Sequence, residues 1–548
     1  MCNKFLSNTT TASFITDILC RHGVKHACIS PGSRNTPLTS KLVTEKKIHC
    51  YSHIDERSSA YFGLGIAKTT NRPVAVLTTS GTATANLFPA VIEASLSKIP
   101  LVLITADRPK RLINTGESQT IEQINLFGNH TRDFIDIDPQ NKSVKKQLNQ
   151  LESLMMQCKG FNKSIPGPIH INVRFEEPLL DNNDALNYKI KIKKNKLEKE
   201  SIELPKFKNA LIVSGPCNNQ TEINHIISFS KKINAPIFAD ILSQLRFNSN
   251  NKNINTYYDH YIDHMEIKPD LVIRFGDKPI SKKLTNFLNK HKKITYLIDE
   301  YAGFNDNCGN LINNELGNLT LKNLTKGDSQ YIDYINNLEI KTKKIISDKI
   351  NKSRSQARLV KNMLNYFNSN DFIFIGSSTI LRTFDGFSSK LNKPLNIFSN
   401  YISRGIDGII STSLGMAATN NKTKNYLFIG DISFFYDINA FHILKDQMID
   451  LTIIVVNNNG GQIFTRLPYS KNNIKDFEKF WITPLKTSIK NVSKLFTLSY
   501  FKANLNSIDK IQNISSKKGV NIIEFSISNK SEIKFLEQIS KQISNKLI

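Results

Sequence analysis

The sequence lacks a long apolar run. Its longest apolar stretches, residues 100–106 and 451–456, are far shorter than the ~18 consecutive apolar residues that cross a bilayer. The N-terminus also lacks the apolar core and small-residue cleavage site of a secretory signal. We therefore expect a cytoplasmic protein without a membrane-spanning segment.

Cysteine is scarce and scattered. The seven cysteines never occur in a Cys-x-x-Cys spacing, which excludes a disulfide framework and the common structural zinc sites. We expect all of them to be reduced and to have no role in the chemistry.

Acidic residues are few, with 47 Asp+Glu against 73 Lys+Arg and a formal net charge of +26. Such an excess is typical of proteins that bind nucleic acid. However, Lys, Asn and Ile are abundant everywhere, including residues 189–199 and 248–255, and no RNA-recognition, zinc-finger or helix-turn-helix pattern accompanies the charge. The charge indicates compositional drift, and we expect no nucleic-acid partner.

Hydrophobic residues make up 40% of the 548 residues and charged residues 22%. This balance excludes a disordered or collagen-like chain, and the length suggests three or four domains at roughly 150 residues each. Short apolar runs alternate with amphipathic stretches, which is typical of parallel sheets covered by helices on both faces. The strands we expect are residues 27–30, 74–78, 101–105, 169–173, 210–214, 237–239, 271–275, 294–298, 372–375, 426–429, 451–456 and 520–527.

Two polar stretches divide the chain. Residues 181–199 lack an apolar period and read as a linker, and a long charged helix is expected from residue 332 to about 365. We therefore predict an α/β protein of three domains: residues 1–184, 185–350 and 351–548. The first and third carry nearly all the residues suited to chemistry, whereas the middle one has weak motifs.

The most informative motif has two parts. Residues 430–439 read Gly-Asp-Ile-Ser-Phe-Phe-Tyr-Asp-Ile-Asn, and residues 457–461 read Asn-Asn-Asn-Gly-Gly, each directly after an expected strand. Ligands collect at the carboxyl ends of parallel strands, where helix N-termini offer N–H groups to phosphate. Asp431 and Asn458 supply the oxygen ligands that Mg²⁺ takes together with a diphosphate. Either part alone could be an ordinary turn, but together they predict a metal–diphosphate site.

With this motif the sequence resembles the thiamine-diphosphate enzymes. Within them it is similar to the 2-succinyl-5-enolpyruvyl-6-hydroxy-3-cyclohexene-1-carboxylate synthases. That similarity lies in the pattern Gly-Asp-x-Ser-x-x-x-Asp-x-Asn, in which Ile432 stands where most of the superfamily has Gly, together with Asn-Asn-Asn-Gly-Gly-x-Ile-Phe at residues 457–464. Five further motifs occur in the order of that family, at residues 30–38, 55–57, 79–83, 105–109 and 167–172. The resemblance runs from about residue 14 to the end and is faint between about 185 and 350. It implies a pyrimidine-binding domain, a central domain similar to nucleotide-binding domains, and a diphosphate-binding domain. The central domain lacks a Gly-x-Gly-x-x-Gly pattern, so we do not expect it to bind FAD.

The resemblance implies thiamine diphosphate with Mg²⁺ or Mn²⁺ as cofactors. Glu56 is the implied catalytic carboxylate, which hydrogen-bonds the pyrimidine N1′ and promotes loss of the thiazolium C2 proton. Ile406 matches the apolar wedge beneath the cofactor. The implied cofactor-binding residues are Glu56, Ser378, Ile406, Gly430, Asp431, Ile432, Ser433, Asn458, Gly460 and Ile463, with Asp431, Asn458 and Gly460 at the metal. By residue type alone, Glu56 could instead belong to a solvated charge cluster, and Ile406 could be a core residue.

The implied reaction decarboxylates 2-oxoglutarate and adds the succinyl semialdehyde carbanion to isochorismate, as a transferase step of menaquinone biosynthesis. Both substrates carry carboxylates, which the fixed fork of an arginine suits. The implied substrate-binding residues are Ser33, Arg34, Arg108, Gln119, Lys282 with its neighbour Lys283, Arg382, Arg404 and Phe464, with Ile463 beside Phe464 in the apolar wall. Any single one of these cations could be a surface ion-pair residue.

Two residues depart from the family pattern. Tyr401 stands where we expect a substrate-facing Arg, and Ser377 stands where the family often has Asn. We expect Arg404, three positions further on, to replace part of the lost charge. The departures leave cofactor binding intact and put substrate affinity in question.

The superfamily places its cofactor between the first domain of one subunit and the third domain of another. The resemblance therefore implies a homodimer or a dimer of dimers. Three alternatives stay open: a different 2-oxo acid decarboxylase or carboligase such as an acetolactate synthase, a basic nucleic-acid-binding protein, and an inactive relic. The set of Arg34, Arg108 and Arg382 argues against the first, because small pyruvate-type substrates need fewer cations.

Overall fold

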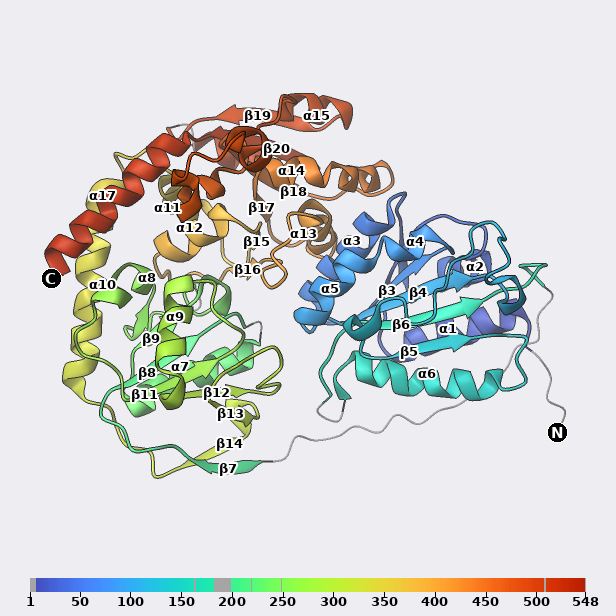
Figure 1. Cartoon of the computed structure of the whole chain (residues 1–548), viewed down its shortest axis with the longest axis horizontal. Helices are drawn as coiled ribbons and strands as arrows, with labels where there is room; N and C mark the ends of the chain where they lie inside the picture. Colours follow the sequence, from blue (N-terminus) through green and yellow to red (C-terminus); the bar gives the residue numbers. More distant parts are fainter. Residues whose placement is uncertain are drawn as a thin grey trace. The chain divides into compact units, whose positions relative to one another are not determined.

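A computed structural model describes residues 6–161, 164–181, 199–217, 219–247, 249–506 and 509–547. These residues form three six-stranded parallel sheets and one two-stranded parallel sheet, with helices between most of the strands (Figure 1). The predicted α/β class is confirmed. Among the described residues, no helix is long and apolar enough to cross a membrane, and the cysteines there are all unpaired.

The first sheet has the strand order β2-β1-β3-β4-β6-β5. Helices α1 and α6 pack against each other, whereas α3 packs against α5, β1 and β3. Its strands are β1 (His26–Ile29), β2 (His49–Ser52), β3 (Val74–Thr78), β4 (Leu101–Asp107), β5 (Phe134–Ile137) and β6 (Ile169–Arg174). Its helices are α1 (Asn8–Arg21), α2 (Thr36–Thr44), α3 (Glu56–Thr70), α4 (Thr82–Ala85), α5 (Phe88–Leu96) and α6 (Val144–Cys158).

The third sheet repeats the topology of the first. Its order is β16-β15-β17-β18-β20-β19. If the strands of each sheet are numbered from the first one in the chain, the two sheets have the same strand order. Its strands are β15 (Phe372–Ile375), β16 (Asn396–Phe398), β17 (Asn425–Gly430), β18 (Leu451–Asn457), β19 (Ser499–Ala503) and β20 (Val520–Ser526). The helices in this part of the chain are α11 (Gln356–Tyr366), α12 (Thr379–Phe387), α13 (Ile409–Ala418), α14 (Asp431–Tyr436), α15 (Ile489–Leu495), α16 (Asp509–Ser515) and α17 (Asn529–Leu547).

The middle sheet has a different order, β10-β9-β8-β11-β12-β13, which is the strand order of a dinucleotide-binding fold. Its strands are β8 (Ala210–Ser214), β9 (Ile237–Ala239), β10 (Ile254–Asn255), β11 (Leu271–Phe275), β12 (Thr295–Asp299) and β13 (Asn310–Asn313), and β7 (Glu200–Glu203) pairs separately with β14 (Leu319–Lys322). The helices here are α7 (Gln220–Ile233), α8 (Tyr258–Tyr261), α9 (Lys282–Lys290) and α10 (Ser329–Ile350).

The predicted strands all occur, within one or two residues at either end. They are the central strands, and β3, β4, β8 and β11 are buried along their whole length. Strands buried on both faces read as continuous apolar runs, which is why the sequence reveals them. The edge strands β2, β5, β13, β16 and β19 were missed because they are partly exposed, so no continuous apolar run marks them. The edge strand β10 was missed because it has only two residues.

The expectation of one helix from 332 to about 365 was wrong. Helix α10 ends at Ile350, and α11 begins at Gln356 after Ser355, whose hydroxyl caps it by accepting the Arg358 N–H. A serine N-cap satisfies a backbone donor that a continuous helix would pair internally. The predicted linker lies largely outside the described residues, and the boundaries at 184 and 350 stay a prediction.

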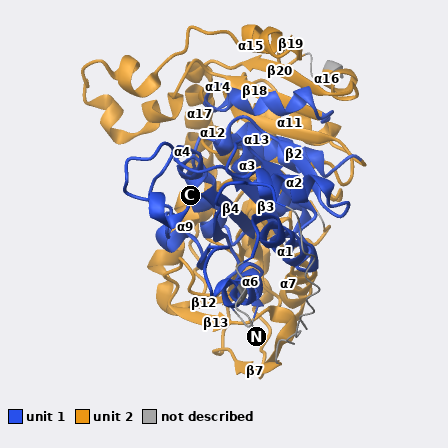
Figure 2. Cartoon of the chain, turned by 90° about the vertical axis from the view of Figure 1, so that its right-hand side faces the viewer, with its two compact units in different colours: residues 1–195, 402–421, 433–450 blue, residues 196–401, 422–432, 451–548 orange. Residues whose placement is uncertain are grey.

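The chain divides into two compact units (Figure 2). The first contains the described parts of residues 1–195 together with 402–421 and 433–450, and the second contains those of 196–401, 422–432 and 451–548. Helix α13 thus joins the unit of the first sheet, although it lies between strands of the third sheet in sequence.

Glycine makes this packing possible. A Cβ atom on Gly65 of α3 would lie 2.0 Å from the Thr412 carbonyl oxygen of α13, and one on Gly415 would lie 2.0 Å from the Phe62 carbonyl oxygen. Any larger residue would separate the two backbones, so these two glycines set the distance between α3 and α13.

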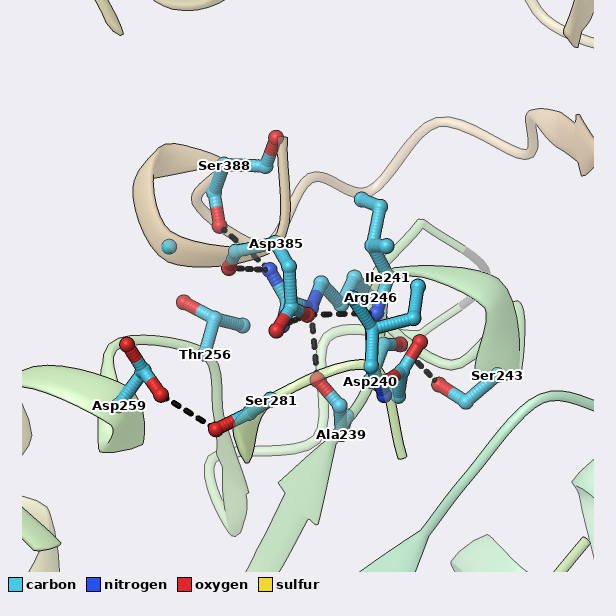
Figure 3. A network of polar contacts seen from close by, with 12 residues as sticks. Ala239, Asp240, Ile241, Ser243, Arg246, Thr256, Asp259, Ser281, Asp385 and Ser388 are labelled. Atoms are coloured by element: carbon cyan, nitrogen blue, oxygen red, sulfur yellow. Dashed lines mark hydrogen bonds and ion pairs between the residues drawn. The ribbon is translucent and has the colours of Figure 1, made fainter. Parts of the chain in front are cut away.

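In the second unit, the fully buried Arg246 joins the middle and third sheets (Figure 3). Its guanidinium lies 2.6 Å from the Asp385 carboxylate of α12 and also donates to the backbone oxygens of Ala239, Asp385 and Ser388. Asp385 further accepts the Ile241 N–H. Burial raises the pKa of Asp385, and the Arg246 charge opposes that rise. The pair thereby fixes α12 to the residues that follow β9.

We expect Arg246→Met to lower the free energy of unfolding by about 3–5 kcal/mol, because it leaves a buried carboxylate without its counter-ion. Urea unfolding followed by circular dichroism measures this change. Lys208→Met is the control, since Lys208 is largely exposed where it pairs with Asp328, and its loss should cost below about 1 kcal/mol. Equal losses in the two variants would contradict the structural role of Arg246.

Candidate functional site

The two parts of the central motif lie at neighbouring strand ends. Strand β17 ends at Gly430 and β18 at Asn457, and the strands pair with Gly430 opposite Val456. Asp431 is the first residue of α14, directly after β17. The predicted placement of both parts at the carboxyl edge of one sheet is therefore correct.

Asp431 is anchored by backbone donors. It is 6% exposed, and its carboxylate accepts the N–H of Gly460 at 2.7 Å and that of Ile432 at 3.0 Å. Burial raises the pKa of Asp431, and these hydrogen bonds, with that from Gly460 foremost, oppose the rise. The carboxylate therefore has a fixed direction and is partly desolvated.

The turn after β18 is built around Gly460. Its φ is +110°, and a Cβ atom there would lie 2.2 Å from the Ile482 carbonyl oxygen. The next residue, Gly461, donates its N–H to the same oxygen at 2.6 Å. Only glycine fits this backbone, so the turn presents Asn458 and the Gly460 peptide beside Asp431 in one way.

The donor set here contains only oxygen atoms. Asp431 offers a carboxylate, Asn458 a half-buried amide and Gly460 a backbone carbonyl, which is the set that Mg²⁺ accepts beside substrate phosphates. A Cβ atom on Gly430 would meet nothing within 4 Å, so there is room in front of the strand end. Among the described residues, no group of three or more His, Cys, Asp and Glu could hold a metal by itself. The residues present fit a metal that also binds a diphosphate.

Ser378 lies at the corresponding strand end one position along the sheet. It is the N-cap of α12 after β15, with φ +85° and ψ −145°. Gly81 has φ +84° and ψ −145° as the N-cap of α4 after β3, so the same turn occurs in both sheets. Serine is strained in this region of backbone space, and strain of this kind gathers at functional sites. Ser377 beside it donates to the Asn400 carbonyl oxygen.

Glu56 opens α3 in the first unit. Asp55 caps the helix by accepting the Ser58 N–H, and the half-buried Glu56 carboxylate accepts a hydrogen bond from Asn86 at 3.4 Å. Its neighbour Arg57 lies 3.9 Å from Asp437. Burial raises the pKa of Asp437 to about 7, opposed by Ser411 and Arg57. Glu56 is thus at the start of a fixed helix and is not in a fully solvated cluster.

The loop that carries Arg404 and Ile406 is held at both ends. Glu93 of α5, which is fully buried, accepts hydrogen bonds from the Ser403 N–H and hydroxyl. Tyr61 of α3 donates to Asp407 at 2.7 Å. Ile406 is 37% exposed between these anchors, unlike a core isoleucine. Sequence inspection missed Glu93 and Tyr61, since their partners are more than three hundred residues away.

Arg34 and Arg108 share one region of the first unit. Arg34 is 6% exposed and donates to the Phe175 carbonyl oxygen and to Glu177. Burial lowers the pKa of Arg34, and the nearby charge of Arg108 lowers it further. Arg108 donates to the Ser118 carbonyl oxygen and to the exposed Gln119 side chain. The predicted residues Arg108 and Gln119 are therefore in direct contact.

The other predicted residues lie in separate places. Lys282 is exposed at the first position of α9, and Lys283 forms a surface ion pair with Asp263. Tyr401 donates to Asp277 at 2.6 Å, so the departure from the family pattern has its own partner. Two more predicted residues are exposed, Ser33 before α2 and Arg382 on α12. On α14, Ile432 is half-buried and Ser433 is buried. Ile463 and Phe464 are half-buried in the short helix Gln462–Arg466.

Comparisons with known proteins agree with these observations. Residues 9–126 match the thiamine pyrophosphate enzyme, N-terminal TPP binding domain, and residues 176–375 match the middle domain of thiamine pyrophosphate enzymes. A relative from Listeria innocua is 32% identical over 94% of this chain and 93% of its own length. A relative from Lysinibacillus sphaericus is 32% identical over 91% of this chain and 90% of its own length. A relative from Staphylococcus aureus is 32% identical over 89% of this chain and 88% of its own length.

All three relatives are named 2-succinyl-5-enolpyruvyl-6-hydroxy-3-cyclohexene-1-carboxylate synthase. Identity at this level over nearly the whole length extends well beyond the matched domains. The chain therefore belongs to the 2-succinyl-5-enolpyruvyl-6-hydroxy-3-cyclohexene-1-carboxylate synthase family of thiamine-diphosphate enzymes.

Proposed function

We propose that this protein converts 2-oxoglutarate and isochorismate into 2-succinyl-5-enolpyruvyl-6-hydroxy-3-cyclohexene-1-carboxylate and CO₂, as a thiamine-diphosphate-dependent transferase of menaquinone biosynthesis. One observation carries the proposal. The buried Asp431 and the Gly460 turn meet at two strand ends, in a chain that is 32% identical to a synthase of this name over 94% of its length.

Thiamine diphosphate with Mg²⁺ or Mn²⁺ fits the strand ends of the third sheet. Asp431, Asn458 and the Gly460 carbonyl would hold the metal, and Gly430, Ile432 and Ser433 would line the diphosphate. When bound, the cofactor supplies the thiazolium that accepts the electron pair released by decarboxylation. The start of α14 adds N–H groups that favour an anion there. Ser378 and Ile463 complete the proposed binding residues on this sheet.

Two residues of the first unit are proposed to act on the cofactor. The Glu56 carboxylate would share a proton with the pyrimidine N1′, and its position on the first turn of α3 holds it in one direction. Ile406 would pack against the cofactor, because the loop around it is fixed at Ser403 and Asp407. Both tasks demand rigid placement, and both residues lie on anchored backbone.

The substrates are anionic, and the proposed residues that contact them include several cations. Arg34 and Arg108 are close enough for the charge of one to lower the pKa of the other, so an anion between them would relieve their repulsion. Gln119 extends this surface through its contact with Arg108. The remaining proposed contacts are Ser33, Lys282, Arg382, Arg404 and Phe464.

We also propose that the protein acts in the cytoplasm as a homodimer or a dimer of dimers. The cofactor would then contact Glu56 of one subunit and Asp431 of another.

Purified protein should consume isochorismate only when 2-oxoglutarate, thiamine diphosphate and Mg²⁺ are all present. Loss of isochorismate absorbance, with each component omitted in turn, measures this requirement. Parallel measurement of CO₂ released from 2-oxoglutarate and from pyruvate tests the alternative. Release from pyruvate without isochorismate consumption would replace the proposal by an acetolactate-synthase-like activity.

Glu56→Gln should lower kcat at least ~100-fold, because a neutral amide cannot take part in proton transfer at N1′. The thermal midpoint should stay close to that of the wild type, since Asp55 still caps α3. Glu537→Gln, an exposed change on α17, is the control and should leave kcat unchanged. Substantial activity in Glu56→Gln would remove this residue from the mechanism.

A mixture of Glu56→Gln and Asp431→Asn subunits tests whether sites are shared between chains. Each variant alone should be inactive. After subunit exchange, about a quarter of wild-type activity should return, because half of the dimers are mixed and one of their two sites is intact. If both residues of a site came from one chain, the mixture would remain inactive after exchange, which mass spectrometry of the intact dimers would verify.

A further inference from the structure

The long connection between β4 and β5 is fixed by a buried side chain that lies outside the residues proposed to bind the substrates. Gln123 is fully buried, although the residues from Lys110 to Gln119 before it are mostly exposed. Both the oxygen and the nitrogen of its carboxamide form hydrogen bonds. The oxygen accepts the Gly81 N–H at 3.0 Å, and the nitrogen donates to Asn172 at 2.8 Å and to the Ala106 carbonyl oxygen at 3.3 Å.

The orientation of Gln123 is determined by its neighbours. The Asn172 side-chain nitrogen donates to Asp107 at 2.9 Å and to Asp136 at 2.8 Å, and carboxylates only accept. The Asn172 oxygen must therefore face Gln123, where it accepts from the Gln123 nitrogen. It follows that the Gln123 oxygen faces Gly81. A residue that cannot both donate and accept would break this chain of bonds.

The same network holds Arg108 by its backbone. The Arg108 N–H donates to Asp107 at 2.7 Å, and the Arg108 carbonyl oxygen accepts from Arg174 at 3.2 Å. Arg174 is buried and pairs with both Asp107 and Asp136. Gly81, at the other end of the Gln123 side chain, lies close to Gln119: a Cβ atom on Gly81 would lie 3.5 Å from the Gln119 carbonyl oxygen. The Gly81 turn therefore packs against Gln119, which Arg108 also contacts.

We propose that Gln123 is a positioning residue for substrate binding. It joins the Gly81 turn to the network behind Arg108, so that Arg108 and Gln119 keep one mutual arrangement. This inference rests on the proposed function, because it takes Arg108 and Gln119 as residues that contact a substrate carboxylate. It also assigns a role to the motif at residues 79–83, because Gly81 of this motif is the residue that Gln123 holds.

The test compares Gln123→Met, which keeps the length of the side chain and removes its hydrogen bonds, with the wild type. The expected result is a rise of about tenfold in KM for isochorismate or 2-oxoglutarate, with kcat changed far less, because the cofactor residues are untouched. Asn521→Leu is the matched control. It removes a buried carboxamide with two donated bonds at the amino end of β20, and its KM values should equal those of the wild type.

A second measurement is independent of turnover. Trypsin cleaves after Lys110 and Arg111, and we expect Gln123→Met to be cut there several times faster than the wild type or Asn521→Leu. Mass spectrometry of the first fragments identifies the site. If the variant is active and both its cleavage rate and its KM are unchanged, the inference about Gln123 is wrong, whereas the proposed function still stands.

Gln123→Glu adds a pH readout. The introduced carboxyl group is buried near Asp107 and Asp136, so its pKa should be raised. When it is protonated it can donate to Asn172 and accept from Gly81, whereas the carboxylate repels the Asn172 oxygen. The ratio of variant to wild-type KM should therefore fall as the pH is lowered, and a ratio independent of pH would contradict the proposed bonds. If the wild type itself leaves isochorismate unconsumed, the proposed function fails and the substrate role of Gln123 fails with it.

Discussion

The hydrogen bond from the Gly460 N–H to the Asp431 carboxylate joins the ends of two neighbouring strands, and the proposed cofactor site depends on it. The carboxyl ends of parallel strands leave backbone groups without partners. Here one buried carboxylate accepts hydrogen bonds from two of them. The glycine at 460 is required because a side chain would collide with the Ile482 carbonyl oxygen.

The first and third sheets share one topology and also one kind of turn. Both sheets follow the same strand order, and each contains a residue with φ near +85° at the N-cap of a helix, after β3 in the first sheet and after β15 in the third, which are not equivalent strands. In the first sheet that residue is Gly81, which is tied to a buried polar network. In the third it is Ser378, a residue proposed to bind the cofactor. The same turn thus lies beside residues proposed to position a substrate in one sheet and beside the proposed cofactor site in the other.

Buried polar groups hold the functional elements in place throughout the molecule. Arg246 and Asp385 fix α12, Glu93 and Tyr61 fix the loop around Ile406, and Gln123 fixes the segment of Arg108 and Gln119. A buried polar group costs free energy unless it is paired, so each network tolerates only one arrangement. This requirement makes such residues suitable for placing exposed side chains accurately.

The sequence by itself determined the α/β class, the central strands and the family, because continuous apolar runs and short glycine-containing motifs are local patterns. It also indicated that Asp431 and Asn458 follow neighbouring strands. Only the tertiary structure decided the edge strands, the break between α10 and α11, the association of α13 with α3, and the partners of Glu93, Tyr61, Gln123 and Tyr401. The reason is that these features depend on burial and on hydrogen bonds between residues far apart in the chain, whose pairing has no local pattern.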